Sequence, residues 1–92
     1  MITPTTRLVR DPALISASLG EEIAMLHVDS GRYYFLNDVA AAVWEHLEVP
    51  TTPAALCATL TARYDVSPSR CESEVLSLLG TLLEKEMIRL VP

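Results

Sequence analysis

The sequence predicts an α+β fold, in which a three-stranded antiparallel sheet precedes three helices in a winged helix-turn-helix-like arrangement. Three observations favour it. Short β-compatible runs come first, separated by the turn signals Gly20 and DSG at 29–31. Later in the chain, the pairs Thr52-Pro53 and Ser67-Pro68 are typical of helix starts. The remaining stretches carry apolar residues at helical spacing. The 92 residues correspond to one domain.

The strands are expected in the first half of the chain. Residues 13–19 have an extended, alternating pattern, residues 21–29 are rich in β-compatible residues, and RYYFL at 32–36 forms the third strand. Residues 1–12 are polar and contain two prolines, so we expect a flexible N-terminal tail there and a folded domain over residues 13–92. MIRLV at 87–91 is compatible with a short terminal strand.

The three helices begin at residues that can cap them. Asn37, Thr52 and Ser67 each offer a side-chain oxygen to the free N–H groups of a first helical turn. The helix from Ser67 is the longest, at about 67–87, and Leu76 and Leu83 widen its apolar stripe beyond the roughly 100° that a surface helix needs. Burial between two neighbouring elements and the lining of a binding groove both explain this excess.

The charge is unsuited to nucleic acid, although the helices and hairpin have the outline of a winged helix. The formal net charge is −5, and the seven Lys and Arg residues are scattered along the sequence. Binding to a phosphate backbone needs clustered cations. A winged-helix regulator is therefore the less favoured alternative, and no nucleic-acid partner is expected.

No catalytic arrangement stands out, so we expect a protein that is not an enzyme and that needs no metal or cofactor. His27 and His46 are the two histidines, and no Ser-His-Asp or Cys-His order is evident. Cys57 and Cys71 fit neither a CxxC nor a zinc pattern. Two buried cysteines are the favoured interpretation, and a thiol nucleophile or redox pair is the alternative.

The sequence also gives an expectation for the compartment. The N-terminal MITPTTRLVR has no apolar core segment of the kind found in signal peptides. The longest apolar run is far shorter than the roughly 20 residues of a membrane span. We therefore expect a cytoplasmic protein that does not associate with membranes.

The stretch GRYYFLND at 31–38 places aromatic residues on both faces of one strand. Alternation puts Tyr34 on the face of Leu36, which leads into the first helix and is expected to face the core, and it puts Tyr33 and Phe35 on the other face. As the last strand of a meander, RYYFL has an open edge guarded only by Arg32. An open edge beside an unusually apolar helix indicates a peptide-binding groove.

Two other interpretations of that strand stay open. The aromatic side chains could simply pack against the neighbouring strand. The open edge could also pair with a second copy, which would give a structural homodimer. We expect a monomer at moderate concentration.

The segment GRYYFLNDVAAAVWEHL resembles the PqqD-like family, in which a strand of the form G-x-Y-Y-x-L-N runs into an Ala-rich, Trp-containing helix. YDVSPSRCESEVLSLLGTLLEKEMI is similar to that family's last helix, so the resemblance covers about residues 13–90. It implies a recognition element for ribosomally made, modified peptides. The leader of the precursor would add as a strand beside 32–36 and lie against the helix at 67–87.

Among PqqD-like proteins, the chain is most similar to the stand-alone leader-binding protein of lasso-peptide biosynthesis. That resemblance implies delivery of the precursor to a separate cysteine-protease-like leader peptidase and a cyclase. A PqqD-type chaperone for a different modified-peptide pathway, with a radical-SAM enzyme as its partner, is the alternative.

The resemblance also implies a leader-binding site with two walls. The strand wall comprises Arg32, Tyr33, Tyr34, Phe35 and Leu36, and the helix wall is drawn from Arg70, Glu74, Val75, Leu78 and Leu82. Periodicity alone does not establish which of the helix residues face the groove. Arg70 and Glu74 could pair with charges on the leader or lie on a solvated helix face, and the acidic domain would suit a leader that carries lysines.

Overall fold

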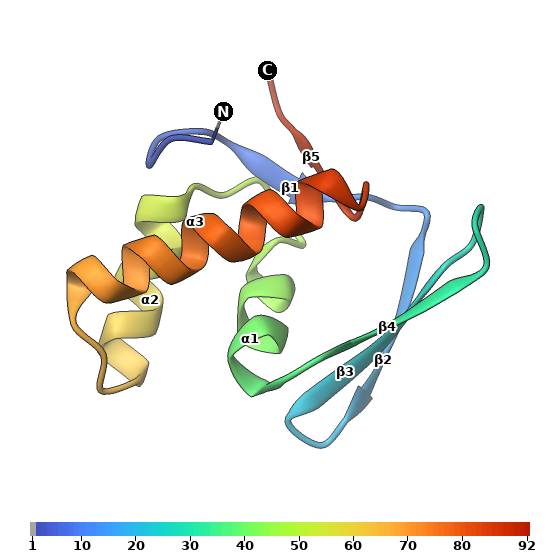
Figure 1. Ribbon diagram of the computed structural model, residues 1–92, viewed down its shortest axis with the longest axis horizontal. Helices are drawn as coiled ribbons and strands as arrows, with labels where there is room; N and C mark the ends of the chain where they lie inside the picture. Colours follow the sequence, from blue (N-terminus) through green and yellow to red (C-terminus); the bar gives the residue numbers. More distant parts are fainter. Residues whose placement is uncertain (1) are drawn as a thin grey trace.

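A computed structural model describes residues 2–92 and has helices to one side of a projecting sheet (Figure 1). The elements follow one another as β1 (Leu8–Arg10), β2 (Leu14–Leu19), β3 (Glu22–His27), β4 (Arg32–Leu36), α1 (Asp38–His46), α2 (Pro53–Arg63), α3 (Pro68–Glu84) and β5 (Ile88–Leu90). Strands β2, β3 and β4 form one antiparallel sheet in that order, and β1 pairs with β5 in another. The predicted three-stranded sheet followed by three helices is confirmed.

Tight turns fix the register of the three-stranded sheet. Gly20 (φ 69°) lies in the two-residue turn that brings Leu19 opposite Glu22. Gly31 (φ 71°) closes the next turn, where its N–H donates to the His27 carbonyl at 2.8 Å. Both glycines have a left-handed backbone, which side chains disfavour. The inner face of β3 and β4 is thereby turned toward the helices.

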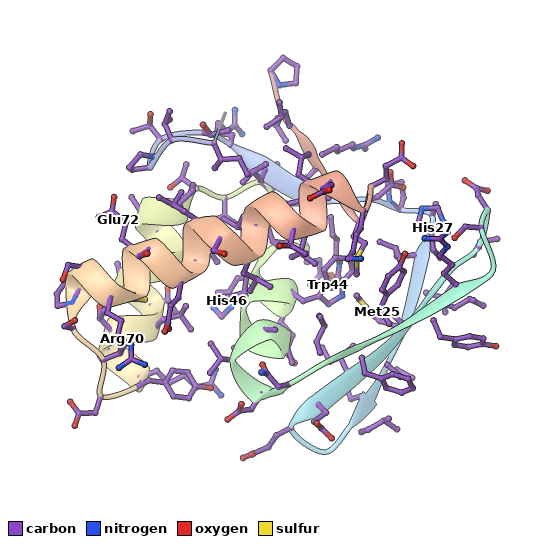
Figure 2. The ribbon with its side chains drawn as sticks, in the orientation of Figure 1. Met25, His27, Trp44, His46, Arg70 and Glu72 are labelled. Carbon is purple, nitrogen blue, oxygen red and sulfur yellow. The ribbon has the colours of Figure 1, made fainter. Side chains whose placement is uncertain are left out.

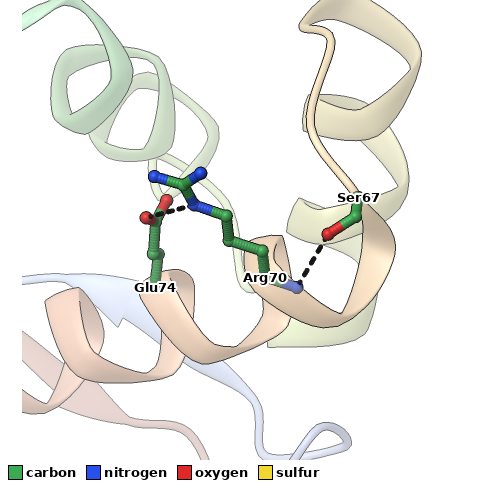
Figure 3. Close-up of polar contacts among 3 residues, drawn as sticks. All are labelled: Ser67, Arg70 and Glu74. Carbon is green, nitrogen blue, oxygen red and sulfur yellow. Dashed lines mark hydrogen bonds and ion pairs between the residues drawn. The ribbon is translucent and has the colours of Figure 1, made fainter.

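The predicted caps begin all three helices. The side-chain oxygen of Asn37 accepts the Ala40 N–H at 2.9 Å, and that of Thr52 accepts the Ala55 N–H at 3.2 Å. Ser67 caps α3 more loosely, at 3.4 Å from the Arg70 nitrogen (Figure 3). These bonds satisfy N–H groups that the helix itself leaves free.

The end of α3 has a defined geometry. Glu86 is left-handed (φ 59°), its N–H donates to the Leu83 carbonyl at 3.1 Å, and the Met87 N–H donates to the Leu82 carbonyl at 2.9 Å. This pair of bonds is a Schellman motif, in which an apolar residue after the cap packs back on the helix. Met87 fills that role, because it is only 1% exposed. The motif turns the chain into β5.

The expectation of a flexible tail over residues 1–12 is wrong for β1. Leu8 is fully buried and pairs with Leu90 of β5. On its other side, its N–H donates to the Thr51 carbonyl at 2.8 Å, and the Thr51 N–H returns a bond of 2.9 Å. The strand predicted as compatible with 87–91 is confirmed as β5, and it provides the partner that orders the N-terminal segment. Met1 lies outside the described residues.

The core lies between α1, α3 and the inner face of the sheet. Trp44 of α1 is 1% exposed and points toward the same interior as Met25 of β3 (Figure 2). The Arg10 guanidinium covers the Trp44 ring, with its carbon 5.5 Å from the ring centroid. Such a cation–π contact links β1 to the central aromatic residue.

Replacement of Trp44 by Ala is expected to lower the free energy of unfolding by about 3–5 kcal/mol, since it removes the largest core side chain. Chemical denaturation followed by circular dichroism measures this loss. Val49→Ala is the matched control because Val49 is 63% exposed and should change stability little. A stable Trp44→Ala protein that no longer binds peptide would reverse the assignment of Trp44 to the core.

Candidate functional site

Strand β4 has an open edge because β3 is its only strand partner within residues 2–92. The hydrogen-bonding pattern shows which backbone groups face that edge. The Val28 N–H donates to the carbonyl of Ala13, the residue before β2, at 3.1 Å. Because the bonding alternates along the strand, the backbone groups of Ile15, Ala17 and Leu19 also point toward β3. The same alternation directs His27 and Met25 toward β4.

This alternation leaves the N–H and C=O groups of Tyr33 and Phe35 facing outward from the sheet. Arg32, Tyr34 and Leu36 use their backbone groups for bonding with β3. An extended peptide laid beside β4 would therefore find two residues with both a free donor and a free acceptor.

The side chains of Tyr33 and Phe35 lie on the outer face of the sheet, away from the helices. They are 70% and 73% exposed, and they stand opposite Leu26 and Ala24 in the register. Ile15 and Leu19 of β2 share this face and are 61% and 55% exposed. The outer apolar face, defined by the side chains of Ile15, Leu19, Leu26, Tyr33 and Phe35, is thus largely open to solvent.

A groove separates β4 from the C-terminal half of α3. Its polar cavity has a volume of about 600 Å³ and is lined by His27, Ser30, Arg32, Tyr34, Thr81, Glu84, Lys85 and Glu86. The Lys85 ammonium lies 5.9 Å from the centroid of the Tyr34 ring, so these two side chains connect the helix side of the groove with its strand side. The expected groove between the third sheet strand and the third helix is present.

A second hollow, the apolar cavity, lies among the helices. It has a volume of about 120 Å³ and is lined by Val39, Val43, Leu60, Tyr64, Val66, Cys71, Glu74, Val75 and Leu78. Val39, one turn beyond the end of β4, is 41% exposed, so this cavity opens near the point where β4 gives way to α1. The two cavities differ in chemistry, one being rich in charge and the other almost entirely apolar.

The structure determines the phase of α3, which periodicity left open. Val75 and Leu82 are 4% and 2% exposed and belong to the core, although Val75 also forms part of the wall of the apolar cavity. Leu82 contributes to neither cavity. Leu78 is half-buried and lines the apolar cavity.

Arg70 and Glu74 lie on the exposed surface of α3. The Arg70 Nε donates to Glu74 Oε1 at 3.1 Å, one helical turn away (Figure 3). Exposed pairs of this kind contribute little to stability. Glu74 also borders the apolar cavity, so a charged peptide group arriving there would compete with Arg70.

Three residues of the helix wall were missed from the sequence. Thr81, Glu84 and Lys85 line the polar cavity. Thr81 lies within the predicted stretch, and Glu84 and Lys85 follow closely after its last residue, Leu82. Positions 74, 78, 81 and 85 follow the i, i+4, i+7, i+11 spacing of a single helix face, and position 70 lies about one turn before them. A stripe that starts at Glu74 reaches Lys85, whereas the apolar residues of α3 mark mainly its core face.

Cys57 does not have the chemistry of an activated nucleophile. Burial and hydrogen bonding with Cys71 raise the pKa of the Cys57 thiol to about 11. A reactive cysteine needs a lowered pKa, because the thiolate is the nucleophile. The histidines lie apart in the chain, on β3 and α1, and His46 Nδ1 is bonded to the Ala42 carbonyl of its own helix at 2.8 Å (Figure 2).

Two features are absent from residues 2–92. No group of three or more His, Cys, Asp or Glu side chains is placed to hold a metal ion there. None of the helices described is both long and apolar enough to cross a membrane.

Comparison with known proteins identifies relatives of this chain. The profile described as "Coenzyme PQQ synthesis protein D (PqqD)" matches residues 22–88. The structure "TbiB1 in Complex with the TbiA(beta) Leader Peptide" is 27% identical with a TM-score of 0.83, and the match covers 88% of this chain and 94% of that one. No curated protein matches the chain.

A second solved structure is similar over nearly the same length. "Lasso peptide synthetase B1 complexed with the leader peptide" is 28% identical with a TM-score of 0.79, and the match covers 92% of this chain and 98% of that one. The resemblance noted in the strand-to-helix segment is therefore confirmed by both the profile and the structures.

Alkylation of Cys57 by iodoacetamide is expected to be slow at pH 7.5 and to accelerate only as the pH approaches 11, because the folded protein disfavours the thiolate. The shift is upward from 9.0, so the stability linked to this thiol is present below pH 9 and is lost as the pH rises toward 11. Mass spectrometry of modification against pH tests this, with denatured protein as the control. A midpoint at or below 9 would contradict it.

Proposed function

Because the chain belongs to the PqqD family, we propose that it binds the leader segment of a ribosomally made precursor peptide as an additional strand on β4. The observation that carries the proposal is the open edge at Tyr33 and Phe35, which borders the groove between β4 and α3. The two structural relatives described with leader peptides support it, since each is similar over most of its length.

The strand edge would supply affinity that depends little on leader sequence. Backbone hydrogen bonds to Tyr33 and Phe35 are available to any extended peptide, so selectivity has to come from side chains. Because alternate residues of an added strand point to opposite faces, half of the leader side chains would point into the groove. The others would continue the outer apolar face beside Tyr33 and Phe35.

The two cavities would bind different side chains of the leader. The apolar cavity, bordered by Val39 and Leu78, suits an apolar or aromatic side chain. The polar cavity carries Arg32 and Lys85 as well as Glu84 and Glu86, so it suits a charged or hydrogen-bonding side chain. The proposed site therefore uses the backbone of β4 and the helix face that includes Glu74, Leu78, Thr81 and Lys85.

The protein would act without catalysis, in the cytoplasm, and deliver the bound precursor to other enzymes. The raised pKa of Cys57 and the separate positions of the histidines give it no evident nucleophile. We propose a lasso-peptide pathway with a separate cysteine-protease-like leader peptidase and a cyclase, and a radical-SAM pathway is the alternative. The outer apolar face is available for such a partner while the leader occupies the edge.

Calorimetric titration with a synthetic leader segment of the cognate precursor peptide is expected to show saturable one-to-one binding. Tyr33→Pro should weaken it by more than about 1 kcal/mol, because proline removes an N–H that faces the open edge and that β3 does not use. Tyr33→Ala, which keeps the N–H, separates the backbone contribution from that of the side chain. Tight binding by a folded Tyr33→Pro protein would refute strand addition at this edge.

Leu78→Glu is expected to weaken leader binding by a similar amount, since it places a charge at the mouth of the apolar cavity. Leu78 is half-buried, so the fold should tolerate the change better than at Val75, which is 4% exposed. Val49→Glu is the control, as an exposed apolar site elsewhere. Equal affinities for the wild type and Leu78→Glu would show that the leader does not use this cavity.

A further inference from the structure

The three-stranded sheet has a second open edge, on β2, at the side opposite β4. Within residues 2–92, β3 is the only element against which β2 packs extensively. Five successive residues of β2, from Ile15 to Leu19, are exposed. The strand LISASL contains no charged residue and no proline, which are the usual guards of an edge.

The backbone pattern identifies the free groups of this edge. Ile15, Ala17 and Leu19 direct their N–H and C=O groups toward β3, as the bond from Val28 to Ala13 requires. The corresponding groups of Ser16 and Ser18 therefore face outward. The side chains of Ile15, Ala17 and Leu19 lie on the outer face, and those of Ser16 and Ser18 lie on the inner one.

We propose that β2 is a self-association edge, at which a second copy of this chain pairs antiparallel about a two-fold axis through Ala17. In this register Ile15 faces the partner copy's Leu19, and Ala17 faces its own equivalent. Ser16 and Ser18 face each other across the axis. In this register the N–H and C=O groups of Ser16 would bond with those of the partner copy's Ser18. These are the outward-facing groups that β3 does not use, so the register gives each of them a hydrogen-bond partner.

The edge fits a second copy better than an unrelated strand. Apolar residues meet apolar residues on the outer face, and hydroxyl groups meet hydroxyl groups on the inner face, which are both favourable cross-strand pairs. No like charges face each other within the paired strands, because β2 has none. The result is a continuous six-stranded sheet whose outer strands are the two β4 strands, with both proposed leader sites open.

The association should be weak and concentration-dependent. A single pair of short strands buries much less than the roughly 1,200 Å² of a stable interface. The monomer that the sequence predicts at moderate concentration is consistent with a dimer that forms only when the protein is more concentrated, or when several copies are held close together. The proposal does not depend on leader binding, so the two can fail separately.

Cysteine cross-linking tests the register directly. Ala17→Cys is expected to form a disulfide-linked dimer under mild oxidation, because residues facing each other in a non-hydrogen-bonded pair have Cα atoms about 4.5 Å apart. Ser16→Cys and Ser18→Cys should each fail to cross-link alone, since each lies two residues from its equivalent. An equimolar mixture of those two variants should cross-link. The wild type reports any background from Cys57.

Sedimentation of the untagged protein at up to millimolar concentration gives the second readout. Ser16→Pro removes an N–H that only the partner would use, and Ala17→Lys places like charges across the axis; each is expected to weaken dimerisation at least tenfold. Both variants should bind leader as the wild type does. A monomer at all concentrations, or equal cross-linking of all three single cysteine variants, would overturn the proposal.

Discussion

The pairing of β3 with both of its neighbours is the constraint on which the rest of the structure depends. One register, set by the turns at Gly20 and Gly31, decides which side chains face the helices and which backbone groups reach the two edges. A slip by one residue would exchange Met25 and Leu26 between core and solvent. Because Met25 is 1% exposed and packs with the core, burial holds the register in place.

That register also explains why the aromatic strand can serve two purposes. Leu36 and Tyr34 continue the inner face, where Leu36 is buried and Tyr34 contacts Lys85, the C-cap residue of α3. Tyr33 and Phe35 are left on the outer face with their backbone groups directed away from β3. Tyr33 and Phe35, whose side chains do not contribute to the core, are therefore the residues whose backbone groups can bond to an added strand.

Most of the three-stranded sheet and all of the helix starts were predictable, because turns and caps are local signals. The cap at Asn37 and the two Pro-containing starts need only a few neighbouring residues. The contribution of β1 was not predictable in the same way, since Leu8 is held by Thr51 and by β5, at the far end of the chain. Pairing over such a separation leaves no local pattern in a polar, proline-containing segment.

The candidate site shows the same division between local and tertiary information. The strand wall followed from the alternation of side chains along β4. The helix wall depended on the rotation of α3, and an apolar stripe wider than the roughly 100° of a surface helix does not specify that rotation. Packing of Val75, Leu79 and Leu82 into the core fixes it. Leu78, Thr81 and Lys85 then lie toward the cavities.

The two open edges of one sheet can differ in specificity because different structures lie above them. A peptide on β4 gains side-chain contacts from α3 and from two cavities, so its sequence matters. Within residues 2–92, β2 packs extensively only against β3 and lines none of the cavities described above. Backbone hydrogen bonds alone do not distinguish one added strand from another. Only a strand with the same alternation of apolar and hydroxyl side chains adds complementarity there, and β2 itself is such a strand.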